Sequence, residues 1–119
     1  MAKKCGNSVV YIPDRGDFVH FNLDPRTGKE QCGKRFGLII SPQKFNKVSS
    51  LAFACPITTK IKGFSFEVEI IDNPGRVYGV VLVHHLRSID WKAREVEYVE
   101  DAPQQVVDEV VAKLEPLIF

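Results

Sequence analysis

Apolar residues recur with two different periods along this chain, and the change of period restricts the fold more than any other feature. From Phe18 to Tyr98 they alternate with polar residues or form short apolar runs, which is the pattern of short β-strands. From Val106 onward they follow the spacing of one helical face. No long helical pattern separates the strands, so parallel pairing is not expected. The pattern predicts a mainly β fold, a small and strongly bent antiparallel sheet or barrel with one C-terminal helix.

Turn sequences rich in proline, glycine and asparagine divide the expected strands. We expect strands at residues 18–23, 36–41, 51–58, 66–70, 77–83 and around 96–98. Proline cannot donate a ladder hydrogen bond, so Pro56 is expected at a sheet edge or a strand end. Residues 42–46 begin with proline and predict one helical turn. His84 and His85 end the strand expected at residues 77–83, so their side chains are expected on opposite faces.

The C-terminal stripe predicts a single amphipathic helix. Asp101 or Ala102 is expected to cap this helix, with Pro103 in its first turn. Pro116 is expected to end it, because an interior proline costs about 3 kcal/mol. The apolar residues of the stripe are Val106, Val107, Val110, Val111, Leu114, Leu117 and Ile118.

Length and composition indicate an ordinary globular protein. The chain has 119 residues, 45% of them apolar, which predicts one domain over residues 1–119 with frayed residues 1–10. No apolar run approaches the roughly 20 residues of a membrane span, and no signal peptide is visible. The cysteines Cys5, Cys32 and Cys55 are an odd number without metal-like spacing. Reduced thiols and a cytoplasmic location are therefore expected, with Cys55 in the core.

The formal net charge of +1 conceals a strong segregation along the chain. Residues 26–62 carry eight basic side chains against Glu30, a net charge of +7. Residues 95–119 carry seven acids against Lys113, a net charge of −6. The asymmetry indicates a polyanionic partner for the basic segment, with the mutual neutralisation of the two segments as the alternative.

Motifs for nucleotide, metal or serine-hydrolase chemistry are missing from the sequence. There is no P-loop, dinucleotide fingerprint, CxxC pair, HExxH motif or GxSxG elbow. The histidines have no ligand spacing to one another or to cysteine. We therefore expect neither a metal nor another cofactor.

Two basic loops carry the chemistry that the sequence does suggest. Residues 29–35 and 58–63 combine arginine, lysine and threonine side chains with one acid between them, Glu30. Guanidinium, ammonium and hydroxyl donors are the set that binds a phosphodiester. Residues 87–91 are interpreted instead as a structural corner, in which Trp91 packs and Arg87 pairs with Asp90.

At these residues the sequence resembles the MazF/PemK family of toxin endoribonucleases, from about Ile12 to the C-terminus. The order and spacing of many short pieces carry the resemblance. These pieces are Arg15-Gly16-Asp17, Leu23-Asp24-Pro25, Glu30-Gln31-Cys32-Gly33-Lys34-Arg35, Ser41-Pro42, Phe45-Asn46, Pro56-Ile57-Thr58-Thr59, Gly63-Phe64, Gly79-Val80-Val81 and Arg87-Ser88-Ile89-Asp90.

The resemblance implies a fold, an activity and partners. The fold is an SH3-like barrel of roughly five to seven short antiparallel strands with short helices and a C-terminal helix. The activity is that of a type II toxin, a homodimer that cuts single-stranded mRNA at short motifs without a metal. The partner is a cognate antitoxin whose acidic, disordered tail covers the RNA groove.

The resemblance also assigns catalytic roles. Arg35 and Thr58 occupy the positions of the family's catalytic arginine and threonine. Some members use a histidine and an aspartate instead, and this sequence has Lys29 and His84 there. The chain thus departs from that second version of the mechanism.

Cleavage without a metal can proceed by attack of the 2′-OH on the neighbouring phosphate. Arg35 and Thr58 would stabilise the additional charge on the phosphorane. Arginine is a poor general base because its pKa exceeds about 12. Glu30 and His84 are the alternative bases, and the residues alone do not choose between them.

RNA binding would use side chains of both loops. Lys29, Lys34, Lys60 and Lys62 are expected on phosphates. Base recognition needs stacking and edge hydrogen bonds, for which Gln31, Phe36, Phe45, Asn46 and Phe64 are candidates. Thr59 and Arg87 complete the RNA-binding prediction.

Two other functions remain open from sequence. A toxin of the same fold could bind DNA gyrase without cleaving RNA, because the fold alone does not determine function. A plain SH3-like binding module is the third reading. The presence of both Arg35 and Thr58 favours the nuclease.

Overall fold

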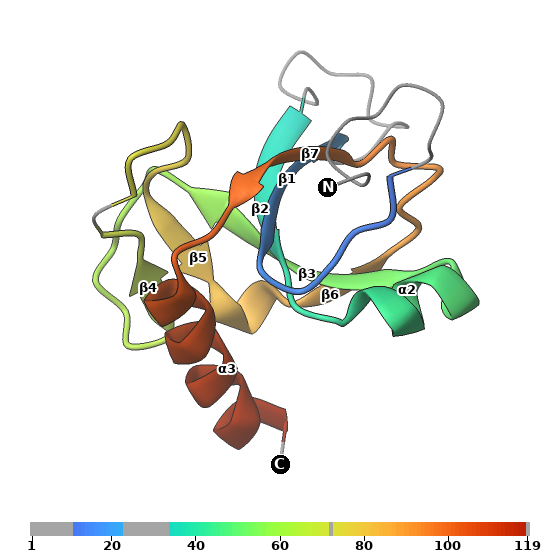
Figure 1. Ribbon diagram of the computed structural model, residues 1–119. Coiled ribbons are helices and arrows are strands. Elements are labelled where there is room, and N and C mark those ends of the chain that lie inside the picture. Colours follow the sequence, from blue (N-terminus) through green and yellow to red (C-terminus); the bar gives the residue numbers. More distant parts are fainter. Residues whose placement is uncertain (1–10, 23–33, 72, 119) are drawn as a thin grey trace.

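A computed structural model describes residues 11–22, 34–71 and 73–118, and it places seven strands in one bent antiparallel sheet (Figure 1). The described elements are β1 (Asp17–Asn22), β2 (Lys34–Ile39), α2 (Gln43–Ser49), β3 (Ala52–Thr58), β4 (Glu67–Glu69), β5 (Val80–Leu82), η2 (Val83–His85), β6 (Arg87–Ile89), β7 (Glu97–Asp101) and α3 (Gln104–Ile118). The strand order is β4-β5-β3-β2-β1-β7, and β6 pairs with β3. This confirms the predicted mainly β class with a C-terminal helix.

Two hydrophobic clusters lie on opposite faces of the sheet. Strand β1 contributes to both, because Phe18 belongs to one cluster whereas Val19 and Phe21 belong to the other. Helix α3 covers the first cluster with four buried residues of its predicted stripe, Val106, Val107, Val110 and Leu114. Cys55 is fully buried in that cluster, and burial raises the pKa of its thiol to about 12, so it is an inert core residue as predicted.

Strand β3 is the centre of the bend, which corrects the expectation for Pro56. Residues Ala52 to Ala54 pair with β6, whereas Ile57 and Thr58 pair with β5. Pro56 lies between these two pairings and faces Gly37 of β2. The proline therefore occupies a central strand, at the point where its missing N–H is not needed by either partner.

Helix α3 also differs from the prediction at its end. It continues through Pro116 to Ile118, instead of ending at the proline. Pro116 removes the one helical bond that its own backbone nitrogen would donate, and the helix continues for only two more residues. The predicted stripe extends beyond the buried face, because Val111, Leu117 and Ile118 are exposed.

The segment before β5 is fixed to β7 by Glu100. Its carboxylate accepts hydrogen bonds from the backbone N–H of Arg76 (2.9 Å) and of Val77 (3.2 Å), and from Nδ2 of Asn73 (2.9 Å). Burial by itself raises the pKa of Glu100, but these hydrogen bonds and the charge of Arg76 together lower it. The carboxylate thereby stabilises the segment that leads into β5 and from there to His84.

Within the described residues, no helix combines the length and apolarity that crossing a membrane requires. The frayed residues expected at 1–10 and the strand end expected at Leu23 lie outside the described residues.

Candidate active site

A pocket of about 200 Å³ brings together side chains from both predicted basic loops. We call it the Arg35 pocket. It is lined by Arg35, Thr58, Lys60, Lys62, Phe64, Glu67, Leu82, His84 and His85. Pockets that enclose a drug-sized ligand usually measure roughly 300–1,000 Å³. The Arg35 pocket is smaller than this range.

Thr58 lies at the end of β3 and is positioned by two neighbours. Lys60 donates its backbone N–H to Thr58 Oγ1 at 3.1 Å. An acceptor site of the hydroxyl is therefore occupied, and its proton remains able to donate to a ligand. Gly79, the residue before β5, approaches closely, because a Cβ there would lie 2.3 Å from the carbonyl oxygen of Thr58. Glycine at this position lets the strands pair beside the site.

Arg35 is exposed on β2, opposite Phe21 of β1 in the register. Its guanidinium and the Thr58 hydroxyl enter the same pocket from different strands. The sequence placed these two residues in separate loops, and the antiparallel sheet brings them together.

His84 lies in the η2 turn and not on a strand, which corrects the prediction for the histidine pair. The strand ends at Leu82, and the turn lets both side chains lie on the surface. Their ring centroids are 4.2 Å apart, and the His84 ring lies 3.9 Å from that of Phe66. The two rings are therefore neighbours within the Arg35 pocket and do not lie on opposite faces.

The pKa of His84 is lowered from its usual value. Desolvation has the largest effect, His85 acts in the same direction, and the charge of Glu67 opposes both. A lowered pKa keeps the imidazole neutral and able to accept a proton.

Other predicted residues separate into those at the pocket and those elsewhere. Lys60, Lys62 and the half-exposed Phe64 line the pocket. Thr59 is exposed beside it, and Arg87 is exposed on β6, but neither lines it. Lys29, Glu30 and Gln31 lie outside the described residues, as does the side chain of Lys34.

Asn46 is buried inside the protein, so its prediction as a base-recognising residue is wrong. Its Nδ2 donates to the carbonyl oxygens of Pro13 (2.8 Å) and Ser41 (3.1 Å), and its Oδ1 accepts from Ser41 Oγ at 2.5 Å. Trp91 Nε1 donates to the backbone oxygen of Asn46 at 3.0 Å. We call this set the Asn46 network. Both N–H groups of the Asn46 amide are used inside the protein, and the residue has no exposed surface with which to contact a nucleotide.

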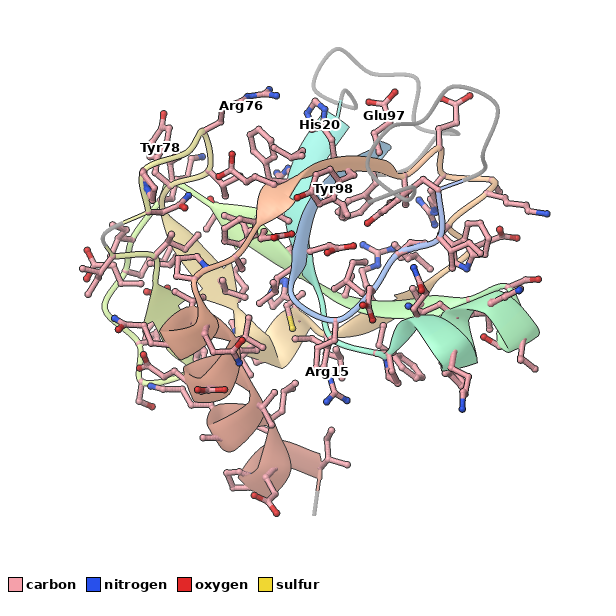
Figure 2. The ribbon with its side chains drawn as sticks, viewed as in Figure 1. Arg15, His20, Arg76, Tyr78, Glu97 and Tyr98 are labelled. Carbon is pink, nitrogen blue, oxygen red and sulfur yellow. The ribbon has the colours of Figure 1, made fainter. Side chains whose placement is uncertain are left out.

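Two phenylalanine candidates for base recognition also lie away from the pocket. Phe45 of α2 stacks on Phe53 with centroids 5.6 Å apart, in a separate groove that Arg15 helps to line. Phe36 is half-buried, with the ring of His20 at 4.7 Å and the guanidinium of Arg76 at 5.8 Å. Figure 2 shows His20 and Arg76 at the upper edge of the molecule and Arg15 at its lower side.

Sequence reasoning missed Glu67 as a pocket residue. Glu67 and Glu69 both alternate with apolar residues on the strand expected at residues 66–70, and this pattern does not separate the two. Among the described residues, no group of three or more histidine, cysteine or acidic side chains is arranged to hold a metal ion.

Comparison with known proteins gives a consistent result. Residues 14–118 match the family described as PemK-like, MazF-like toxins of type II toxin-antitoxin systems. The chain is 33% identical over 108 residues to the endoribonuclease toxin MazF of Escherichia coli K12, covering 91% of this chain and 96% of that protein. It is 34% identical over 111 residues to the endoribonuclease PemK of Escherichia coli, covering 88% and 81%.

Solved structures agree with this match. The fold superposes on MazF from Deinococcus radiodurans with a TM-score of 0.81 and 43% identity, covering 92% of this chain and 98% of that one. A MazE-MazF complex from the same organism gives a TM-score of 0.80 and 42% identity, covering 92% and 97%. The chain therefore belongs to the PemK-like, MazF-like family of toxins of type II toxin-antitoxin systems.

Proposed function

We propose that this protein is a sequence-specific endoribonuclease toxin that cleaves single-stranded mRNA without a metal cofactor. The observation that carries the proposal is the common pocket of Arg35, Thr58 and His84 beside two lysines. A guanidinium and a hydroxyl offer donors to phosphate oxygens, and a neutral imidazole offers an acceptor. The relatives at 33–34% identity are named endoribonucleases, which supports the same activity here.

The proposed reaction begins at the ribose 2′-OH. The 2′ oxygen attacks the adjacent phosphorus while a base removes its proton. The bond from phosphorus to the 5′ oxygen then breaks, which leaves a 2′,3′-cyclic phosphate and, once the 5′ oxygen gains a proton, a 5′-OH. Arg35 and the Thr58 hydroxyl stabilise the extra negative charge on the pentavalent phosphorane, because charged and preorganised donors act most strongly where charge develops.

His84 and Glu30 are the candidate bases for the first step. His84 lines the pocket, and its lowered pKa favours the neutral form that accepts a proton. Glu30 precedes Arg35 in the motif that the resemblance identifies, outside the described residues. The location of His84 beside Arg35 and Thr58 favours it as the base.

The RNA and antitoxin contacts are proposed at the Arg35 pocket, and the homodimer contact at a separate surface. Lys60 and Lys62 would contact phosphates on either side of the scissile bond. An antitoxin with an acidic segment would compete for these cations, and the related MazF is solved as a complex with MazE. Exposed apolar side chains on α2, on β3 and between them (Phe45, Val48, Leu51 and Phe53) favour a protein contact, which supports a homodimer.

The test uses an unstructured RNA, excess EDTA and the Arg35→Ala variant. We expect cleavage by the unsubstituted protein in EDTA, with a 2′,3′-cyclic phosphate at the new end. Loss of the Arg35 guanidinium is expected to reduce cleavage about 10²- to 10³-fold while folding is retained. Lys47→Ala, which removes an exposed cation on α2 outside the pocket, is the control.

Each outcome of this test is informative. Cleavage by Arg35→Ala at the unsubstituted rate would refute the assigned site. Intact RNA with the unsubstituted protein would refute the nuclease and favour the gyrase-binding alternative. Loss of cleavage in EDTA alone would indicate a metal-dependent enzyme.

A further inference from the structure

An acidic side chain in a pocket for RNA requires a physical reason. Among the described residues that line the Arg35 pocket, Glu67 is the single carboxylate, and it lies with Arg35, Lys60 and Lys62. A carboxylate there opposes the binding of a polyanion, because affinity for nucleic acid depends on neutralising phosphates. The contacts of Glu67 give it a different role.

Glu67 binds the backbone of the loop between β3 and β4. Its Oε1 accepts hydrogen bonds from the N–H of Lys62 at 3.2 Å and of Gly63 at 3.0 Å. Gly63 has φ of +80°, a conformation that side-chain-bearing residues rarely adopt. Hydrogen bonds to a charged acceptor are roughly twice as strong as neutral ones. The carboxylate therefore stabilises the turn that ends the segment carrying Lys60 and Lys62.

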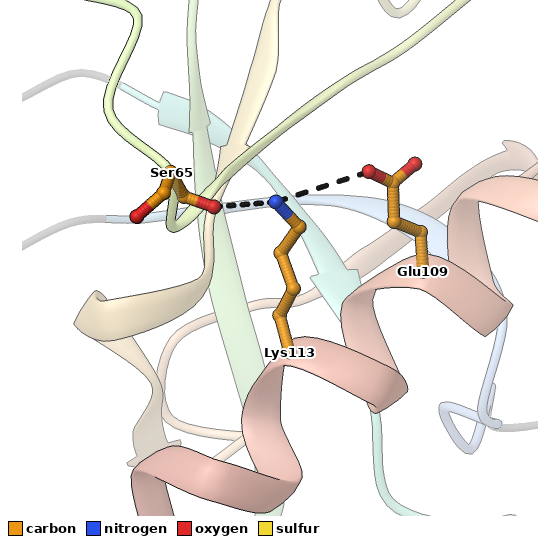
Figure 3. Close-up of polar contacts among 3 residues, drawn as sticks. All are labelled: Ser65, Glu109 and Lys113. Carbon is orange, nitrogen blue, oxygen red and sulfur yellow. Dashed lines mark hydrogen bonds and ion pairs between the residues drawn. The ribbon is translucent and has the colours of Figure 1, made fainter.

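Helix α3 holds the same loop at a second point. Lys113 Nζ donates to the carbonyl oxygen of Ser65 and lies 3.9 Å from Glu109 one turn earlier (Figure 3). Lys113 is the sole basic residue among residues 95–119 of the sequence. The loop is thus bound at residues 62–63 by Glu67 and at Ser65 by the helix.

We propose that Glu67 is a positioning residue, which holds the 59–66 loop so that Lys60 and Lys62 meet RNA beside Arg35 and Thr58, with Lys113 as a second support. This inference rests on the proposed ribonuclease function. It also makes a prediction opposite to the one expected from the negative charge of Glu67 alone. Neutralising Glu67 would strengthen RNA binding if charge were its main effect, whereas loss of positioning slows cleavage.

The first experiment compares kcat and KM of Glu67→Ala, Glu67→Gln and Glu69→Gln on one RNA. Glu69 is exposed on the same strand, so its variant removes the same charge without touching the loop. For Glu67→Ala we expect KM to rise, because the displaced Lys60 and Lys62 no longer meet the phosphates. We expect kcat to fall about 10- to 100-fold, because the loop also carries the Lys60 N–H that binds Thr58 Oγ1 and small misplacements are costly. Glu67→Gln retains an acceptor oxygen and is expected to lose less. Unaltered kcat in Glu67→Ala, or equal losses in Glu69→Gln, would overturn the proposal.

The second experiment needs no activity, so it separates failure of this inference from failure of the proposed function. Amide hydrogen exchange at Lys62 and Gly63 is measured by NMR on the RNA-free protein. We expect faster exchange in Glu67→Ala and unaltered exchange in Glu69→Gln. Equal protection in all three proteins would refute the contact, whether or not the unsubstituted protein cleaves RNA.

The contribution of Lys113 is tested by the same measurement. Lys113→Met keeps the aliphatic chain and removes the donor to Ser65, so we expect faster exchange at residues 64–67 and a smaller loss of kcat than in Glu67→Ala. Glu109→Gln is the control for the ion pair on the helix surface. Unaltered exchange in Lys113→Met would remove this residue from the proposal.

Discussion

The Arg35 pocket and the Asn46 network are both polar, both arise from recognisable sequence motifs, and they do opposite things. In the Asn46 network the side chains of Ser41 and Asn46 are buried and their donors are directed at atoms inside the protein. In the Arg35 pocket the Arg35 and His84 side chains are exposed, and Thr58 keeps a hydroxyl proton available. Polar residues that form their hydrogen bonds inside the protein specify its fold, whereas those at the surface remain available to a ligand.

The difference divides the basic segment of residues 26–62. Its positive charge suggested one continuous RNA track. The structure puts Lys60 and Lys62 at the Arg35 pocket, but Lys44 and Lys47 are on α2, the helix that contains Asn46. The positive charge of this segment therefore comes both from lysines at the pocket and from lysines on a helix away from it.

The largest effect is expected at Thr58. Thr58→Val removes a donor from the phosphorane without changing the shape of the side chain, and we expect kcat to fall about 10²- to 10³-fold. Thr58→Ser keeps the hydroxyl and is expected to retain most activity. Cleavage rates on one RNA under single-turnover conditions provide the measurement. Equal rates for the Val and Ser variants would show that the hydroxyl is not used.

His84 is expected to control the acidic limb of the pH–rate profile. A base must be neutral, so kcat/KM falls as the pH drops through the pKa of His84, which lies below its usual value of about 6.5. The charged or titratable side chains that share the pocket with it are Arg35, Lys60, Lys62, Glu67 and His85. We expect His84→Gln to lose about 10²-fold in kcat/KM and the limb itself. Survival of the limb in that variant would exclude His84 as the base, and loss of the limb in Glu30→Gln would then identify Glu30.

Asn46 is expected to affect stability and not catalysis. Asn46→Ala leaves the carbonyl oxygens of Pro13 and Ser41 without their donor, and we expect a loss of about 3 kcal/mol in the free energy of unfolding. Urea denaturation measures this loss. Lys47→Ala, an exposed neighbour on the same helix, is expected within about 0.5 kcal/mol. A stable Asn46→Ala protein with reduced RNA affinity would show that Asn46 serves RNA binding and not the stability of the fold.

The smallest effect is expected from the lysines. Replacing Lys60 and Lys62 together by glutamine should weaken RNA binding and reduce the slope of log K against log salt by about 0.7 for each phosphate that is no longer neutralised. The matched control replaces Lys44 and Lys47, which removes the same charge from α2. Titration of a labelled, uncleavable RNA at several salt concentrations gives both slopes. Equal changes of the salt slope in the two double variants would show that RNA contacts both pairs of lysines, as one continuous basic surface.

Some positions of the fold followed from local chemistry, and others did not. The alternation around Phe18 and the stripe from Val106 predicted β1 and α3, because strand and helix periodicities are local properties. The predictions made from Pro56 and Pro116 were wrong, because the destabilisation that a proline causes depends on the backbone groups that surround it in the fold. The prediction that His84 and His85 lie on opposite faces was wrong, because the strand ends at Leu82, before the end of the apolar run.

By itself the sequence determined the mainly β class, the C-terminal helix, the burial of Cys55 and the family resemblance carried by motifs around Arg35 and Thr58. It did not predict β6, because residues 87–91 were interpreted as a structural corner. These features depend on short-range periodicity and on residue types at fixed spacing. Only the tertiary structure decided which motif residues share a pocket, that Asn46 is structural, and that Glu67 binds the loop of Lys62 and Gly63. The reason is physical: a polar side chain gains its role from partners that the sheet brings together from distant positions, and spacing along the chain does not contain that information.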